Sequence, residues 1–339
     1  AQGLVQKEGL YAAGWISYEA APAFDSAFCT RAATAFPLVC FGLFDPPAAL
    51  SALPSTNAIP SGSSVWTPSV SRREYDSAIA SIRDHLAAGD TYQVNYTFRL
   101  TSNFTDHPWS FFHMACADAP YGAYLEAEPY VICCASPELF FHLQGERIQS
   151  KPMKGTASRG RTLAEDEANA CRLYESEKDR AENVMIVDMI RNDLGRIAHM
   201  GSVTVPRLFE IEKYATVWQL TSTVEALTAA TIPEILGSLF PCASITGAPK
   251  VKTMEIIAKL ETSPRSLYTG AIGFFGPNRE ACFNVAIRTT LINARTGRAE
   301  YGVGGGIVWD STAREEYEEC LNKAKIVLNP LPASPLQLL

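Results

Sequence analysis

The chain has 339 residues, of which 47% are apolar, and a formal net charge of -7. Its acidic balance, with scattered Lys and Arg, argues against nucleic acid or an anionic membrane as a partner. No apolar run approaches the roughly 20 residues of a membrane helix, and the opening AQGLVQKEGLYAAG lacks the pattern of a signal peptide. Nine cysteines without CxxC spacing favour free thiols, so we expect a cytoplasmic protein.

Residues 1–64 are predicted to form short strands, such as GWISYEA and PLVCFGLF, followed by a linker rich in Pro, Ser and Ala from Pro46 to Ser64. After the linker, Ser71 and Glu74 form a capping box, which predicts the start of a helix. An apolar stripe of helical period follows at Tyr75, Ile79, Ile82 and Leu86. The next stretch, TYQVNYTFRL, alternates as a strand does.

Further strands are predicted at GAYLEAEPYVICCASPELFFHL, LYTGAIGFFG, CFNVAIRTTLINA and AEYGVGGGIV. Helices are predicted at DEANACRLYESEKDRAENVMIVDMIRNDLGRIAHM, APKVKTMEIIAKLE and TAREEYEECLNKAKIVL. The strands come in antiparallel-looking groups, with helices between the groups and not after every strand. This order predicts an α+β fold with helices covering sheet faces, and not a doubly wound parallel sheet.

Two predicted helices carry acidic pairs. Asp179 and Glu182 are three residues apart and share a helix face, as do Glu316 and Glu319. Four carboxylates from two helices suit a hard cation such as magnesium, which prefers oxygen ligands. Charge runs are more often a solvated helix face, and spacing alone favours that interpretation.

Two segments contain features that can bind an anion. SITGAPKVKTMEIIAKLE leads from a Thr-Gly-Ala turn into a helix whose free N–H groups attract anions, although the same pattern fits an ordinary helix start. YGVGGGIVWD is a poor match to a dinucleotide loop because the spacing is not GxGxxG. Its glycines either bring backbone amides close to a carboxylate or mark a bulge in a strand.

Two single residues leave alternatives open. Arg288 alternates with Ala286 and Thr290 in a predicted strand, and a lone strand arginine is more often exposed than functional. Glu138 follows a proline in the apolar run CASPELFF. Burial there would raise its pKa and make it a general acid, whereas an edge strand would leave it at the surface.

The sequences and the order of six motifs closely resemble those of the chorismate-utilising enzymes. This family includes anthranilate, aminodeoxychorismate, isochorismate and salicylate synthases. The motifs are ASPELF, KPMKGTASRG, KDRAENVMIVDMIRNDLGRIA, SITGAPKVKTMEIIAKLE, GAIGFF and GGGIVWDSTAREEYEECLNKA. The resemblance implies two antiparallel-rich sheets packed face to face with helices outside. It also implies one catalytic unit over residues 1–339, made of two intertwined subdomains, with a chorismate-binding core over 65–330.

The resemblance assigns roles residue by residue. Glu182 and Glu319 match magnesium ligands, with Asp179 and Glu316 close by, and Glu138 matches the general acid. The positions that match chorismate-binding residues are Gly155, Thr156, Thr246, Tyr268, Arg288, Gly304, Gly305, Gly306 and Lys323. At Gln219 many relatives carry a histidine, so less detail can be transferred there.

Lys154 indicates the branch of the family. Water-using branches carry a lysine base at the position of Gln93, and anthranilate synthases resemble PIAGT where this chain has PMKGT. A lysine at 154 resembles the aminodeoxychorismate branch, in which the amine adds at C2 of chorismate, the C4 hydroxyl leaves, and ammonia then adds at C4. We therefore expect amination of chorismate to 4-amino-4-deoxychorismate, for p-aminobenzoate and folate synthesis.

No glutaminase-type nucleophile elbow surrounds any cysteine in the sequence, so the resemblance implies a separate glutamine amidotransferase that supplies ammonia. Two alternatives stand beside this expectation. One is an anthranilate synthase component I, and the other is a non-catalytic subunit that only binds the amidotransferase. Intact Glu138, Lys154, Glu182 and Glu319 count against the second.

Overall fold

The computed structural model describes residues 2–56, 64–116, 119–214 and 217–328. Of the predicted linker Pro46 to Ser64, residues 57–63 lie outside the described residues, and the described remainder contains no helix or strand. Within the described residues, nine antiparallel strands form a first sheet, sheet A. Their order is β10 (Thr204–Lys213), β11 (Val217–Leu227), β8 (Arg147–Lys151), β7 (Leu139–Gln144), β14 (Glu280–Val285), β13 (Ala271–Gly276), β1 (Tyr11–Ile16) and β2 (Val39–Phe44), with β9 (Met153–Ser158) beside β11.

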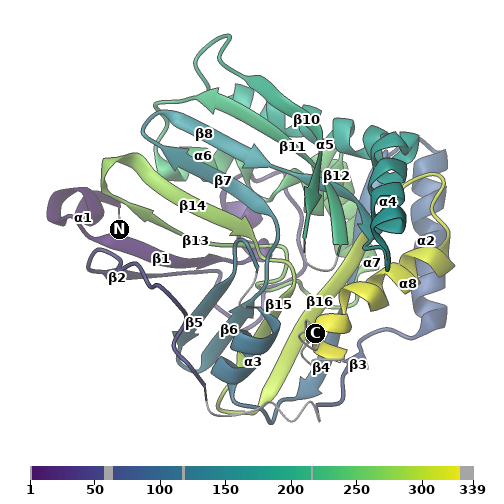
Figure 1. The fold of residues 1–339 in the computed structure, drawn as a ribbon, viewed down its shortest axis with the longest axis horizontal. Helices are drawn as coiled ribbons and strands as arrows, with labels where there is room; N and C mark the ends of the chain where they lie inside the picture. Colours follow the sequence, from purple (N-terminus) through teal and green to yellow (C-terminus); the bar gives the residue numbers. More distant parts are fainter. Residues whose placement is uncertain (1, 57–63, 117–118, 215–216, 329–339) are drawn as a thin grey trace.

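Seven described strands form sheet B, which is also antiparallel. The order is β12 (Gly247–Ala248), β4 (Gln93–Asn103), β16 (Arg298–Ile307), β15 (Thr289–Asn293), β6 (Tyr130–Cys134) and β5 (Ala123–Ala127), with β3 (Thr67–Pro68) beside β4. The two sheets and the helices around them are seen together in Figure 1.

The described helices are α1 (Gln2–Glu8), α2 (Arg72–Ala87), α3 (Pro108–Ala115), α4 (Leu163–Glu175), α5 (Glu177–Gly195), α6 (Ile232–Leu239), α7 (Lys250–Leu260), α8 (Ala313–Lys323) and α9 (Lys325–Leu328). Short 3-10 turns lie at Tyr18–Ala23, Ala243–Ile245 and Pro277–Arg279. Helices α5 and α6 pack on sheet A, and α2, α3 and α8 pack on sheet B. In the described part of the chain, no helix is long and apolar enough to cross a membrane.

A third apolar cluster joins the two sheets. It brings Trp15 and Ile272 of sheet A against Ile132 and Cys134 of sheet B. Apolar clusters on both outer faces and one between the sheets correspond to the predicted α+β fold of two face-to-face sheets, and confirm it.

Strand β4 shows why a polar site forms between the sheets. Val94, Tyr96, Phe98 and Leu100 point into the apolar cluster below α2 and α8. The alternate residues are also buried, although all are polar: Gln93, Asn95, Thr97 and Arg99. Because successive strand residues face opposite sides, this second row points into the space between the sheets.

Three predicted elements are divided in the structure. The helix predicted at TAREEYEECLNKAKIVL is α8 and α9, which are separated at Ala324. The long helix predicted over the DEANAC…RIAHM stretch is interrupted at Ser176, which leaves the helical conformation and caps α5 by accepting a hydrogen bond from the Asp179 N–H. The single strand predicted at CFNVAIRTTLINA is β14 of sheet A and β15 of sheet B. Arg288 is therefore not in a strand: it lies at the crossing between the sheets, with φ 52°.

Candidate active site

The glycine-rich strand β16 lies at the centre of the candidate site. Its close neighbours leave no room for side chains: a Cβ at Gly302 would lie 2.1 Å from the ring of Tyr268, and one at Gly304 would lie 2.5 Å from a backbone oxygen of β4. At Gly306 a Cβ would lie 3.0 Å from Lys154 Nζ. The glycines thus allow predicted site residues from other elements to approach the strand.

Lys154 extends from β9 toward this strand and is half-buried. The side-chain amide of Gln93 borders the same space, because its Nε2 would lie 3.3 Å from a Cβ at Gly306. Gln93 is fully buried, and neither of its amide atoms has a hydrogen-bond partner among the described residues. Unpaired buried amide atoms are costly, so this side chain is available to bind a polar ligand beside Lys154.

The other two cations of the KPMKGTASR segment are engaged elsewhere. Lys151 forms an ion pair with Glu212. Arg159 holds both carboxylate oxygens of Asp166, at 2.6 and 2.7 Å. One pair lies just before β9 and the other just after it, and Lys154, between them, is directed at the glycine strand.

Glu138 is the most strongly perturbed carboxyl group near Lys154. It is buried just before β7, and its Oε1 accepts a 2.7 Å hydrogen bond from the Ser244 hydroxyl. Burial raises the pKa of Glu138 to about 7, although the Ser244 hydrogen bond and the charge of Lys154 act in the opposite direction. A carboxyl group of this kind can donate a proton at neutral pH.

The predicted metal ligands come from α5 and α8. Burial raises the pKa of Glu182, and the neighbouring carboxylates Asp179 and Glu319 raise it further, whereas the charge of Lys154 opposes them. Asp179 packs against Gly155, where a Cβ would lie 3.0 Å from its Oδ1. Carboxylates that lie close enough for Asp179 and Glu319 to raise the pKa of Glu182 have the oxygen donors of a hard-cation site.

The two α8 carboxylates already have protein partners. Glu316 is buried and accepts a 2.6 Å hydrogen bond from Ser311. Glu319 forms a 2.6 Å ion pair with Lys323, whose ammonium also donates to the Gly304 carbonyl at 2.8 Å. Desolvation alone would raise the pKa of Glu319, but the Lys323 charge lowers it. In the described chain no three His, Cys, Asp or Glu residues are grouped to hold a metal, so the four-carboxylate magnesium site stays a prediction.

The remaining predicted positions line the space between the sheets. Thr246 is fully buried at the end of a 3-10 turn, and Tyr268 is buried under the guanidinium of Arg99, 4.9 Å from its ring centre. Thr156 donates a 3.0 Å hydrogen bond to Gln219, the position where the resemblance expected a histidine. The structure therefore brings residues from both sheets around β16, with carboxylates of α5 and α8 at its border.

Some residues of the site escaped the sequence analysis. Ser244 is the first residue of the SITGAPKVKTMEIIAKLE motif but received no role there, although its hydroxyl donates a hydrogen bond to Glu138. Asn95 and Thr97 could have been found from the alternation of polar and apolar residues in QVNYTFR. The apolar face of this strand packs in a core, so the polar residues on its other face need hydrogen-bond partners from the protein or a ligand.

Comparison with known proteins identifies similar chains. The family model described as chorismate binding enzyme matches residues 2–329. Aminodeoxychorismate synthase component 1 of Bacillus subtilis is 43% identical over 254 residues, which cover 74% of this chain and 54% of that protein. An anthranilate synthase component 1 of Haloarcula marismortui is 37% identical over 262 residues, covering 76% of this chain and 53% of that protein. The chain spans about half the length of these relatives.

A solved structure is also similar. The crystal structure of anthranilate synthase component I from Streptococcus pneumoniae TIGR4 matches with a TM-score of 0.82 and 26% sequence identity. The match covers 94% of this chain and 80% of that one.

Proposed function

This chain belongs to the chorismate-binding enzyme family, and we propose that it aminates chorismate at C4, giving 4-amino-4-deoxychorismate for p-aminobenzoate and folate synthesis. The proposal depends above all on Lys154, whose Nζ lies within 3.0 Å of the missing Cβ position of Gly306 and shares that space with the Gln93 amide. A buried glutamine cannot act as a general base for water, whereas an amine can attack carbon.

In the first proposed step, the uncharged Lys154 amine forms a bond to C2 of chorismate. The two ring double bonds shift, and the C4–O bond breaks. The buried Glu138 donates its proton to the departing hydroxyl, which leaves as water, while the attacking nitrogen loses a proton to solvent, from which Glu138 is protonated again. The pKa of about 7 caused by burial supports this role, because it keeps much of Glu138 protonated at neutral pH.

In the second proposed step, ammonia adds at C4, the double bonds shift back, and the C2–N bond breaks. Lys154 leaves with a proton and is restored. A glutamine amidotransferase partner supplies the ammonia, which is consistent with the name component 1 of the Bacillus subtilis relative. We place the reaction in the cytoplasm, and the nine free cysteines support a reducing compartment.

Chorismate has two carboxylates, and the site has cations for both. Arg288, at the crossing between the sheets, would pair with the enolpyruvyl carboxylate. Lys323 and the backbone of Gly304–Gly306 would bind from the β16 side, where Tyr268 packs against Gly302, and Thr246 would bind from beside Asn95 of β4. Gly155 and Thr156 border Lys154 along β9 and would fix the approach of its amine.

Magnesium is the proposed cofactor. Glu182 and Glu319 would hold it, with Asp179 and Glu316 close by, since all four offer the oxygen donors that magnesium prefers. When bound, the ion would polarise the ring carboxylate of chorismate. The burial of Glu182 and the nearness of Asp179 and Glu319, both of which raise its pKa, support a shared site for these oxygen donors.

The test uses chorismate, magnesium and an ammonia source with the purified protein. We expect Lys154→Ala to abolish C4 amination, whereas Lys151→Ala, which removes a cation already paired with Glu212, retains it. Formation of anthranilate by the unaltered protein would favour the rival function, the one carried by the Haloarcula marismortui relative. Binding of an amidotransferase without any chorismate turnover, even at high ammonia, would favour the non-catalytic alternative.

A further inference from the structure

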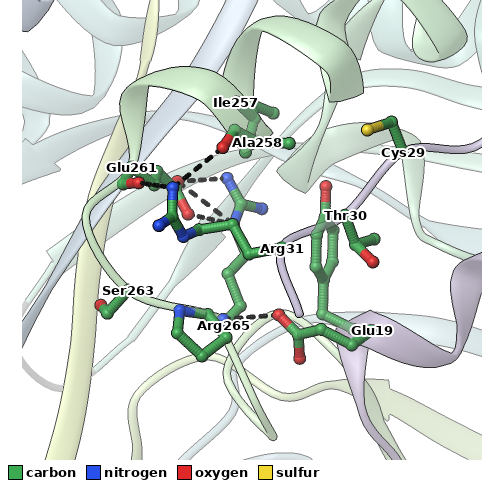
Figure 2. A pocket seen from close by; sticks show the side chains of 11 residues that line it. Glu19, Cys29, Thr30, Arg31, Ile257, Ala258, Glu261, Ser263 and Arg265 are labelled. Atoms are coloured by element: carbon green, nitrogen blue, oxygen red, sulfur yellow. Dashed lines mark hydrogen bonds and ion pairs between the residues drawn. The ribbon is translucent and has the colours of Figure 1, made fainter. Parts of the chain in front are cut away.

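A fully buried arginine lies behind the proposed substrate wall. Arg265 follows α7, in the loop that leads to Tyr268, and only 1% of it is exposed. Figure 2 shows it beside a small pocket, between Glu261 of the helix end and Glu19 of the N-terminal segment. Neither the motifs nor the proposed reaction gives this residue a role.

The guanidinium of Arg265 connects three segments of the proposed site. It donates to the Ile245 carbonyl at 2.8 Å and to the Asn95 carbonyl at 2.7 Å. It also donates to the Thr269 hydroxyl at 3.2 Å. Ile245 immediately precedes Thr246, and Thr269 immediately follows Tyr268, so one side chain fixes the backbone beside both residues.

The charge of Arg265 is balanced separately. Glu261 forms a 2.7 Å ion pair with it and also accepts hydrogen bonds from the Thr97 N–H and hydroxyl, at 3.0 and 2.7 Å. Because Glu261 supplies the counter-charge, the other donors of the planar guanidinium are available for the two carbonyls and the hydroxyl. A lysine would keep the charge but could not reach all these acceptors.

The loop itself is held in a demanding conformation. Ser266 and Thr269 have φ values of 53° and 60°, in the left-handed region that non-glycine residues rarely adopt. Glu19 accepts hydrogen bonds from the N–H groups of Arg265 and Ser266, at 2.6 and 2.8 Å. Thus both the Arg265 side chain and a carboxylate of the N-terminal segment hold the loop that presents Tyr268.

We propose that Arg265 is a positioning residue for chorismate binding, and that it fixes Thr246 and Tyr268 through its hydrogen bonds to the neighbouring residues Ile245 and Thr269. The inference rests on the proposed function, because it takes chorismate as the ligand. Arg265 itself does not touch the substrate in this account. Arg265 therefore affects the Kd for chorismate by holding Thr246 and Tyr268 in place.

The test is calorimetric titration of chorismate into the full chain carrying Lys154→Ala, in which no covalent adduct forms, with magnesium present and at a temperature well below unfolding. We expect Arg265→Lys to raise the Kd about tenfold or more, the loss expected when one or two substrate hydrogen bonds are misaligned. The matched control is Arg279→Lys. Arg279 also donates to three acceptors, the carbonyls of Gly145, Thr228 and Ala229, but at the far end of β14 from Glu138.

A merely structural role would lower the melting temperature of both variants and leave both Kd values unchanged, and that result would overturn the proposal. If Arg265→Lys does not fold, Glu19→Gln decides: a raised Kd supports the proposal and an unchanged one overturns it. Failure of the unaltered protein to bind chorismate would overturn the proposed function together with this inference, whereas normal binding by the Arg265 variant would overturn the inference alone.

Discussion

Ser244→Ala tests the general acid through the group that controls its pKa. The Ser244 hydroxyl donates a 2.7 Å hydrogen bond to Oε1 of Glu138, and this bond stabilises the ionised carboxylate. Removing the hydroxyl therefore raises the pKa of Glu138 further above about 7. A hydrogen bond to a charged group contributes roughly 1.5 to 3 kcal/mol, which corresponds to a rise of roughly one to two pH units.

The assay follows the first turnover of chorismate, with magnesium present, from pH 5.5 to 9. Because Glu138 has to be protonated while the Lys154 amine has to be uncharged, the pH profile of the unaltered protein should bend at about pH 7, where Glu138 loses its proton. In Ser244→Ala this bend should lie one to two pH units higher. Ser311→Ala is the matched control, since Ser311 donates a similar 2.6 Å bond to the buried Glu316, which is not the proposed acid.

A bend that stays in place in Ser244→Ala, or moves to lower pH, would refute the assignment of Glu138. A bend that shifts equally in Ser311→Ala would do the same, because the effect would then not be specific to Glu138.

Three further predictions follow from the same geometry. Glu138→Gln should stabilise the protein at pH 8 but not at pH 4. The pKa of Glu138 is about 7 in the folded protein and 4.5 ordinarily, so the unaltered protein loses stability as pH rises from 4.5 to 7. Chemical denaturation should show a loss of roughly 3 kcal/mol that the Gln variant avoids. An equal gain at both pH values would contradict the buried-carboxyl account. Gly306→Ala should reduce C4 amination about 100-fold, because its Cβ would lie 3.0 Å from Lys154 Nζ and displace the amine. The melting temperature should change little, because Nζ is the end of a flexible side chain that can move away. Full activity would show that the Lys154 amine does not react in that space. Removal of divalent ions with a chelator should abolish turnover, and added magnesium should restore it. Glu182→Gln should need a higher magnesium concentration for the same rate. An unchanged magnesium requirement in this variant would show that Glu182 is not a metal ligand.

Local patterns predicted the elements well where a few neighbouring residues determine them. The Ser71–Glu74 capping box is present, with both of its hydrogen bonds. TYQVNYTFRL is strand β4, with its apolar row against the helices. Such features depend on contacts within four residues or on the period of the strand, and both can be read directly from the sequence.

Features that depend on distant partners could not be predicted in this way. Nothing in FNVAIRTT indicates that Arg288 lies where the chain passes from one sheet to the other, because that depends on which strands pair on each side. Arg265 and Glu261 resemble an ordinary i, i+4 surface pair in the sequence. They are buried because a segment more than 200 residues away, around Glu19, packs over them.

The most direct measurement is the mass of the protein after mixing with chorismate and magnesium in the absence of any ammonia source. The account predicts a gain equal to chorismate less one water, mapped by proteolysis to the peptide that contains Lys154 and absent from Lys154→Ala. Turnover to an aminated product upon later addition of ammonia, with no such adduct at any time point, would contradict it.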